Sequence, residues 1–236
     1  MTALTYLDFH AVFILPPLAV LAMTARPLAE RRRIMYGGIG LMAVLALFYT
    51  TPWDSYLIWK GVWGYGEGNV LTTLGYMPLE EYMFVLLQPA VTGLWLCHVR
   101  IPPATQMTIT RRDRILGVMA GVAVSLVGVV LFAGTATHYM GAILAWAGPV
   151  FAIQWGFGWP YLRRHWRTVL LGIGVPTLYL SIADRIAIGQ GVWHLSPTYT
   201  TGITVLGLPI EEGAFFLITN AFIVEGIVLL LWVIER

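Results

Sequence analysis

The stretch MPLEEYMF at Met77–Phe84 lies between two long apolar runs, and a similar stretch, LPIEEGAFF, lies at Leu208–Phe216. Each contains Pro-x-Glu-Glu, so the chain twice places two adjacent carboxylates in an apolar setting. The four residues are Glu80, Glu81, Glu211 and Glu212. Ionisable residues next to lipid are costly and are commonly functional. The two glutamate pairs are therefore the first candidates for chemistry.

The composition is typical of a membrane protein. Of the 236 residues, 58% are hydrophobic and 11% are charged, and the mean hydropathy is +0.75, which is far from the balance of a soluble domain. The single cysteine, Cys97, excludes an intramolecular disulfide framework, and the sequence shows no Cys/His spacing of a metal site. The N-terminal segment lacks the basic region and cleavage site of a signal peptide, so we expect it to be retained as a first span.

Apolar windows long enough to cross ~30 Å of hydrocarbon recur along the chain. Because backbone groups in lipid must be paired internally and the sequence lacks the alternation of a barrel, we expect an all-α integral membrane protein with seven transmembrane helices. The seven windows are 5–24, 34–51, 77–98, 115–133, 138–158, 168–184 and 207–233.

Lysine and arginine residues segregate to one side of these spans. Only Lys60 and Arg185 of the fourteen lie on the other side. By the positive-inside rule the basic side is cytoplasmic, which places the N-terminus outside and the C-terminus inside a multi-pass cell-membrane protein. The predicted cytoplasmic residues are Arg26, Arg31, Arg32, Arg33, Arg100, Arg111, Arg112, Arg114, Arg163, Arg164, Arg167 and Arg236.

The chain also repeats internally. DSYLIWKGVW at Asp54–Trp63 aligns with DRIAIGQGVW at Asp184–Trp193, and the glutamate motifs follow each copy. We expect a first repeat at 1–100 (spans 1–3), a connector with span 4 at 101–136, and a second repeat at 137–236 (spans 5–7). Three spans plus one connector make the repeats parallel, so both motifs should face each other at the outer ends of spans 3 and 7.

Proline favours the first turn of a helix, so Pro78 and Pro209 predict helix starts with the glutamates in the first turn. One explanation of the glutamates is structural, since acidic residues complement the helix dipole. Successive helical residues point about 100° apart, so one glutamate of each pair can face the bundle while the other faces a loop or helix. A buried carboxyl kept protonated would be a Brønsted acid aimed at an apolar substrate.

Aromatic residues surround both motifs and could stabilise a cation through their ring faces. Enrichment of Trp and Tyr at membrane interfaces explains part of the same pattern. Together with a proton donor, they predict acid-initiated carbocation chemistry on a hydrocarbon. The candidate residues are Trp63, Tyr76, Tyr82, Phe84, Trp193, Phe215 and Phe216.

Five further polar residues are candidate supporting groups. Asp54 and Asp184 occupy matched repeat positions and could either hydrogen-bond the glutamates or cap their helices. His10 lies at the level of the motifs, where it could equally be structural. Gln88 and Asn220 lie about three turns into spans 3 and 7 and could bridge helices.

Motifs for other chemistries are missing from the sequence. GGIG at Gly37–Gly40 lies inside a span without the strand–turn–helix setting of a dinucleotide fingerprint. We therefore expect no flavin, nicotinamide or metal cofactor and no nucleic-acid partner.

The paired PLEE and PIEEGAFF motifs, the opening YLDFHAVFILPPL and about seven spans resemble the membrane-integral lycopene cyclases of archaea, some bacteria and fungi, over essentially the whole chain. This resemblance implies an intramolecular lyase or isomerase of carotenoid biosynthesis that closes the acyclic ψ-ends of lycopene into β-rings. The product would be β-carotene, formed through γ-carotene without net redox change. It also implies lycopene and membrane lipid as partners, with the four glutamates as the acid–base groups.

Other outcomes stay open at this point. Relatives with similar motifs make ε- or γ-rings, act on C50 carotenoids or hydrate the end group, and the motifs do not separate these reactions. They also leave open which glutamate donates, whether one or both ends cyclise, and the oligomeric state. A small membrane transporter is the alternative from another class, but the acid pairs gather at one face and not at the midplane.

Overall fold

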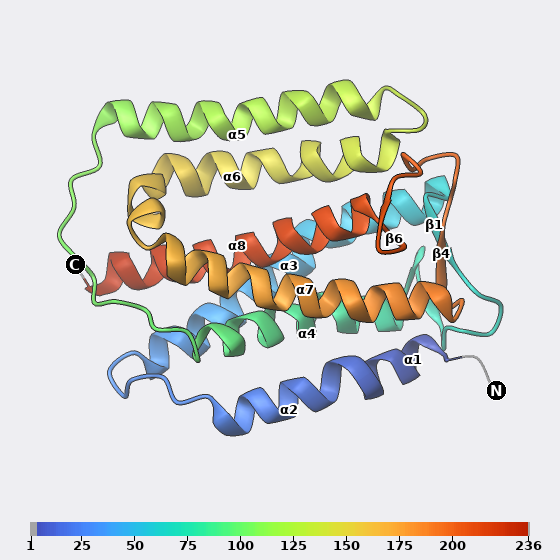
Figure 1. The fold of residues 1–236 in the computed structure, drawn as a ribbon, viewed down its shortest axis with the longest axis horizontal. Helices are drawn as coiled ribbons and strands as arrows, with labels where there is room; N and C mark the ends of the chain where they lie inside the picture. The colour runs from blue at the N-terminus through green and yellow to red at the C-terminus, as the bar shows by residue number, and fades with distance from the viewer. Residues whose placement is uncertain (1–3, 236) are drawn as a thin grey trace.

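The computed structural model describes residues 4–235, and its long helices run side by side along one axis (Figure 1). Residues 1–3 of the first predicted repeat and Arg236, one of the predicted cytoplasmic charges, lie outside the described residues. The helices in chain order are α1 (Tyr6–Phe9), the π-helical turn η1 (His10–Ile14), α2 (Leu15–Thr24), α3 (Arg32–Lys60), α4 (Leu79–Leu96), α5 (Arg111–Phe132), α6 (His138–Arg164), α7 (Trp166–Gly189) and α8 (Ile210–Glu235).

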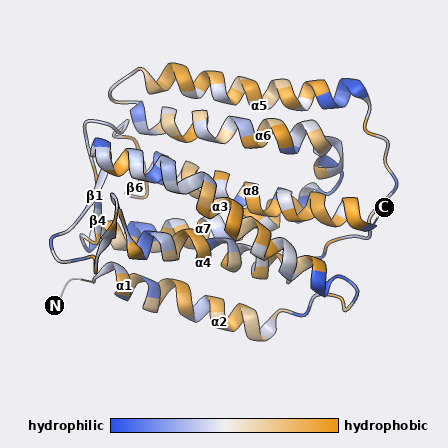
Figure 2. Cartoon of the chain, turned by 180° about the vertical axis from the view of Figure 1, so that it is seen from behind, coloured by the Kyte–Doolittle hydropathy of each residue, from blue (hydrophilic) through white to orange (hydrophobic). Residues whose placement is uncertain are grey.

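The helices agree with an all-α membrane protein. Among the described residues, six stretches are long and apolar enough to cross a membrane, namely the α1–η1–α2 segment, α3, α5, α6, α7 and α8. Figure 2 shows α5 and α8 as mainly hydrophobic along their length. The predicted span 77–98 corresponds to α4, which is not among the six because Glu80, Glu81 and Gln88 lower its hydropathy. Much of α4 is buried against protein, where an apolar surface toward lipid is not needed.

Prolines account for the irregular first helix. Pro16 and Pro17 have no N–H to donate, so the regular pattern of α-helical hydrogen bonds cannot run through them. The N–H of Leu15 instead reaches the carbonyl of His10 and closes a wider turn. The segment continues as one span because neighbouring turns keep their own hydrogen bonds.

Helix α3 is longer than the predicted window 34–51. It continues to Lys60 and ends where Gly61 adopts a left-handed conformation at φ 74°, which glycine tolerates without a Cβ clash. Asp54 therefore lies within the helix, two turns before its end. Asp184 lies similarly within α7, which ends at Gly189.

Helices α5 and α6 pack closely along one side of the bundle (Figure 1). Glycines make this possible: a Cβ added at Gly121 or Gly128 of α5 would collide with the backbone of α6 at Ala152 or Ala145. Small residues at a helix interface let two backbones approach in lipid. Helix α8 lies in the middle of the bundle and is the most buried of the six spans.

The loops at one end contain short strands, which the helical prediction did not include. β1 (Trp63–Tyr65) pairs antiparallel with β4 (Trp193–Leu195), and this joins the two loops that follow the aligned sequences. Two hairpins precede the glutamate helices. Their strands are β2 (Thr73–Leu74) with β3 (Met77–Pro78), and β5 (Thr204–Val205) with β6 (Leu208–Pro209).

The hairpins correct the predicted position of the prolines. Pro78 is not in the first turn but is the N-cap residue, with extended backbone angles of φ −61° and ψ 152°. It pairs with Thr73, as Pro209 pairs with Thr204, so each proline ends a strand and the helix begins at the next residue. The glutamates remain in the first turns of α4 and α8.

At the opposite end of the bundle, one arginine connects three segments. Arg31 forms a salt bridge with Glu235, with Nε 2.6 Å from Oε1. It also donates to the carbonyls of Ile101 and Pro102. These contacts join the loop before α3, the loop after α4 and the last turn of α8, at the end away from the hairpins (Figure 1).

Candidate active site

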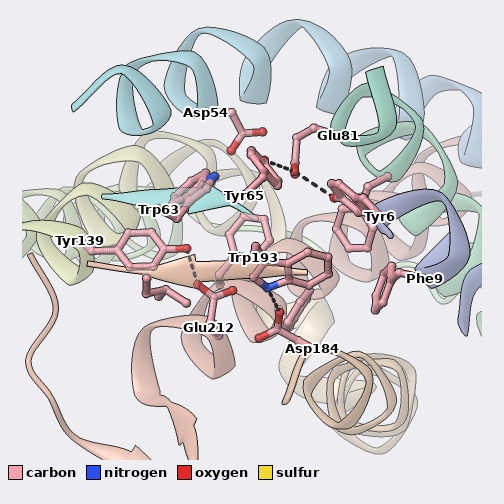
Figure 3. Close-up of a pocket in the computed structure, with 14 residues that line it drawn as sticks. Tyr6, Phe9, Asp54, Trp63, Tyr65, Glu81, Tyr139, Asp184, Trp193 and Glu212 are labelled. Carbon is pink, nitrogen blue, oxygen red and sulfur yellow. Dashed lines mark hydrogen bonds between the residues drawn. The ribbon is translucent and has the colours of Figure 1, made fainter. Parts of the chain in front are cut away.

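The two glutamate motifs meet at one small cavity of about 50 Å³ at the hairpin end of the bundle. Because a water molecule needs roughly 10–15 Å³ on this measure, the cavity has room for only a few waters. Figure 3 shows its side chains converging from several helices and from the β1–β4 ribbon. They are Tyr6, Phe9, Asp54, Trp63, Tyr65, Glu81, Phe84, Tyr139, Asp184, Trp193, Leu195, Glu212, Phe215 and Phe216.

Glu81 is held by two phenols. Its Oε2 accepts hydrogen bonds from the hydroxyls of Tyr6 at 2.9 Å and Tyr65 at 2.7 Å. Burial, together with the nearby charge of Glu81, raises the pKa of Tyr65 well above its ordinary value, so that phenol stays protonated and remains a donor. Tyr6 comes from α1 and Tyr65 from β1, so two separate elements fix the position of one carboxyl.

Glu212 has one such partner. Its Oε1 accepts a hydrogen bond from the hydroxyl of Tyr139 at 2.9 Å. The residue aligned with Tyr65 in the second loop is Leu195, which cannot donate. The two carboxyls facing the cavity therefore differ in their hydrogen bonds although their sequence motifs match.

The first glutamate of each pair points elsewhere, toward the preceding loop. Glu80 accepts a hydrogen bond from the backbone N–H of Leu71 at 2.7 Å. Glu211 accepts from both the backbone N–H and the hydroxyl of Thr201, each at 2.7 Å. Both side chains are fully buried, but neither lines the cavity.

Asp54 and Asp184 both line the cavity, although neither makes a contact that the sequence predicted. Asp184 accepts a hydrogen bond from the indole N–H of Trp193 at 2.8 Å. The prediction that these aspartates cap their helices is wrong, because α3 and α7 continue beyond them. Within residues 4–235, their Oδ2 atoms are buried and have no hydrogen-bond partner.

Five of the seven predicted aromatic residues line the cavity: Trp63, Phe84, Trp193, Phe215 and Phe216. Tyr76 and Tyr82 do not. Tyr76 lies in the β2–β3 turn and is 56% exposed, and the hydroxyl of Tyr82 donates to the carbonyl of Leu74 in the same hairpin. Both follow the pattern of interfacial tyrosines, which the sequence had left as an alternative.

The other predicted polar residues lie behind the cavity wall. His10 is fully buried, with Nδ1 3.0 Å from the carbonyl of Tyr6 and its ring edge-on to Phe84. Gln88 donates to Asn220 at 2.7 Å, and Asn220 donates to Thr177 at 3.0 Å. These amides therefore bridge α4, α8 and α7, as one reading of the sequence predicted.

Sequence reasoning missed the three phenols that bind the site carboxyls. The sequence contains a pattern that relates two of them. Tyr6 lies ten residues before Pro16, and Tyr139 lies ten residues before Pro149, so the two tyrosines occupy matched positions in the repeats. Extending the repeat back to these prolines would have paired the tyrosines. Tyr65 had no such signal, since its counterpart is a leucine.

Within the described part of the chain no basic side chain lines the cavity, although four carboxyls do. Among residues 4–235 no group of three or more His, Cys, Asp and Glu side chains is placed to hold a metal ion. Carboxyls crowded together in an apolar cavity can lower their mutual repulsion by retaining protons. The cavity therefore combines proton-carrying groups with the aromatic faces that stabilise a cation.

Comparisons with known proteins identify the family of this chain. The family model described as lycopene cyclase matches residues 3–98 and 136–228. The chain belongs to the lycopene cyclase family. The two matched segments each contain one glutamate pair and leave α5 between them.

Relatives in archaea and fungi extend the comparison. The chain is 51% identical over 232 residues, 98% of either chain, to a protein of Halobacterium salinarum named lycopene beta-cyclase. It is 34% identical over 235 residues to a bifunctional lycopene cyclase/phytoene synthase of Blakeslea trispora, and it spans 95% of its own length but 38% of that protein. No solved structure matches the chain.

Proposed function

We propose that this protein is a lycopene β-cyclase that converts both ψ-ends of lycopene into β-rings. The observation that supports it best is the single cavity shared by Glu81 and Glu212, two carboxyls from different motifs enclosed by aromatic rings. This site suits an isomerisation that needs a proton donor, a proton acceptor and walls that tolerate a carbocation. The relatives' names provide the substrate class, a carotenoid.

The reaction is balanced in protons. A protonated carboxyl delivers a proton to the terminal double bond, and the next double bond attacks the resulting cation to close the ring. A carboxylate then removes a proton from the ring and leaves the β double bond. An aromatic face beside a desolvated cation contributes ~2 kcal/mol or more, and Trp63, Trp193 and Phe215 line the cavity. Exclusion of water prevents capture of the cation as an alcohol.

The carboxyls divide into two roles in this proposal. Glu81 and Glu212 exchange protons with the substrate, whereas Glu80 and Glu211 position the hairpin loops through Leu71 and Thr201. Because Glu81 accepts from two phenols and Glu212 from one, Glu81 is better stabilised as the carboxylate. We assign proton donation to Glu212 and proton removal to Glu81.

We also infer seven spans arranged as two parallel repeats, 1–100 and 137–236, joined by the connector 101–136. The β1–β4 pairing supports this layout. Trp63 is equivalent to Trp193, and Tyr65 to Leu195, so exchanging the repeats turns the pair Trp63↔Leu195 into the pair Tyr65↔Trp193. The matched hydrogen bonds of Glu80 and Glu211 to their loops support it too. In this layout α4 is the remaining span, the N-terminus is outside and the C-terminus is cytoplasmic.

Expression of the chain in a lycopene-accumulating bacterial host tests the function. We expect β-carotene, with γ-carotene as the intermediate, in the extracted pigments. Unchanged lycopene at normal membrane levels of the protein would contradict the proposal. An ε-ring, a γ-ring or a hydroxylated end group would identify one of the alternative end-group reactions.

A further inference from the structure

A second, larger cavity of about 530 Å³ runs along the bundle next to the active site. It is bounded by α3, α4, α6 and α8, and on α8 it extends from Phe215 to Val233. At about 1.5 Å of rise per residue, these eighteen intervening steps span roughly 27 Å, which is close to the ~30 Å thickness of the membrane interior. This groove is therefore long and narrow, and it runs along the helix axes.

The groove has an apolar character. Most polar groups that reach it bind protein: Tyr49 donates to the carbonyl of Trp146, and Gln88 donates to Asn220. The amide N–H of Gln154 donates to the carbonyl of Phe222, whereas its Oε1 has no hydrogen-bond partner within residues 4–235. Of the residues that the structure describes, no charged side chain lines it. Most of the rest of the lining is aliphatic and aromatic side chains, as expected for a site that holds a hydrocarbon.

The groove adjoins the active site at its hairpin end. Phe84 and Phe215 line both cavities, so these two rings form the wall between them. A stack of rings follows the same boundary, with Trp146 4.8 Å from Trp53 and Trp53 5.8 Å from Phe215 between ring centroids. An end group that moves past Phe84 or Phe215 passes directly from the groove to Glu81 and Glu212.

The groove also opens sideways. Leu45 on α3 and Ile153 on α6 form part of its lining and are 52% and 72% exposed. Nearer the hairpins, α3 and α6 are joined by hydrogen bonds from Tyr49 to Trp146 and from Trp53 to Ala142. A long molecule can therefore enter from lipid along the side of the bundle, while nearer the active site α3 and α6 are held together.

We propose that this groove binds the polyene chain of the carotenoid while one ψ-end occupies the active-site cavity. The inference rests on the proposed function. It explains how a cavity of about 50 Å³ can serve so long a substrate, since only the reacting end enters it. The lateral opening lets the monocyclic product leave sideways and return with its other end first, so one site processes both ends.

The test uses substitutions that fill the groove away from the active site. Ala46 on α3 and Val150 on α6 both line it, and neither lines the catalytic cavity. We expect Ala46→Phe and Val150→Phe to lower kcat/KM for lycopene by at least about tenfold, because binding energy from the polyene is lost. Ala123→Phe, on an exposed face of α5 that lies outside both cavities, is the matched control and should stay within about twofold of wild type.

A shorter substrate separates groove binding from damage to the site. An apo-lycopenal retains one ψ-end but has a truncated polyene, so the filled groove should reduce its cyclisation by less than about twofold. Equal losses for lycopene and the apo-lycopenal would contradict the proposal. Unchanged lycopene turnover in both groove variants would contradict it too, and this is the result expected if a lipid acyl chain occupies the groove instead. Failure of the wild-type protein to cyclise lycopene would contradict the proposed function itself.

Discussion

At the scale of single residues, the site depends on which glutamate of each pair faces the cavity. Neighbouring positions on a helix differ by about 100° in direction. Glu81 and Glu212 therefore meet phenols in the cavity, while Glu80 and Glu211 reach back to loop backbone. Glutamine can accept the loop hydrogen bond as glutamate does, but it cannot transfer a proton.

This difference predicts the outcome of four single substitutions. Glu81→Gln and Glu212→Gln should each reduce formation of both γ-carotene and β-carotene by at least about 100-fold, since general acid–base catalysis contributes roughly 10²–10⁴-fold. Glu80→Gln and Glu211→Gln serve as matched controls and should retain at least about a tenth of the activity, because the loop hydrogen bonds persist. Pigment analysis at equal membrane expression measures all four. If Glu81→Gln or Glu212→Gln keeps half of the wild-type activity, a single shared acid–base site is wrong.

At the scale of elements, the hairpins orient the starts of α4 and α8. Their turns differ in strain. In the second hairpin, Leu206 has a positive φ of 52° and is 96% exposed, in a region that suits glycine or asparagine. The turn of the first hairpin places glycine at the positive-φ position, Gly75 at 69°.

The strain at Leu206 predicts that a substitution can stabilise the protein. Leu206→Asn should raise the free energy of unfolding by about 1 kcal/mol, because asparagine adopts the left-handed conformation at lower cost. Thermal unfolding in detergent measures the effect as a higher melting temperature. Tyr76→Asn, in the turn of the first hairpin at a residue without positive φ, is the control and should give no comparable gain. A lower melting temperature for Leu206→Asn would show that membrane or protein contacts of the leucine outweigh its backbone strain.

At the scale of the whole molecule, charge distribution and helix count imply one orientation in the membrane. The β1–β4 ribbon and both hairpins lie at one end, and the contacts of Arg31 with Glu235 lie at the other (Figure 1). Cytoplasmic loops are enriched in lysine and arginine. The active site is therefore expected near the outer face of the membrane.

Cysteine labelling tests this orientation. With Cys97 replaced by serine, Glu67→Cys and Gln190→Cys should react with a membrane-impermeant reagent in intact cells, and Arg32→Cys should react only after lysis. All three positions are exposed on the protein surface, so protection reports the membrane barrier. Labelling of Arg32→Cys in intact cells with protection of the other two would invert the topology.

The sequence by itself determined the membrane class, the helical architecture and the family, because these follow from hydropathy, charge and repeated motifs that are local along the chain. It also indicated both glutamate pairs and most of the aromatic wall. The predicted span 77–98 corresponds to α4, which is not among the six apolar spans of the described residues, since a helix buried in protein need not be apolar on every side.

Only the tertiary structure decided which groups act together. Tyr6 and Tyr65 approach Glu81 from separate elements, and Tyr139 approaches Glu212 from 73 residues away. Such contacts depend on how helices pack, which spacing along a chain does not encode. The groove along α8 has the same origin, because a cavity exists only between elements that have already been brought together.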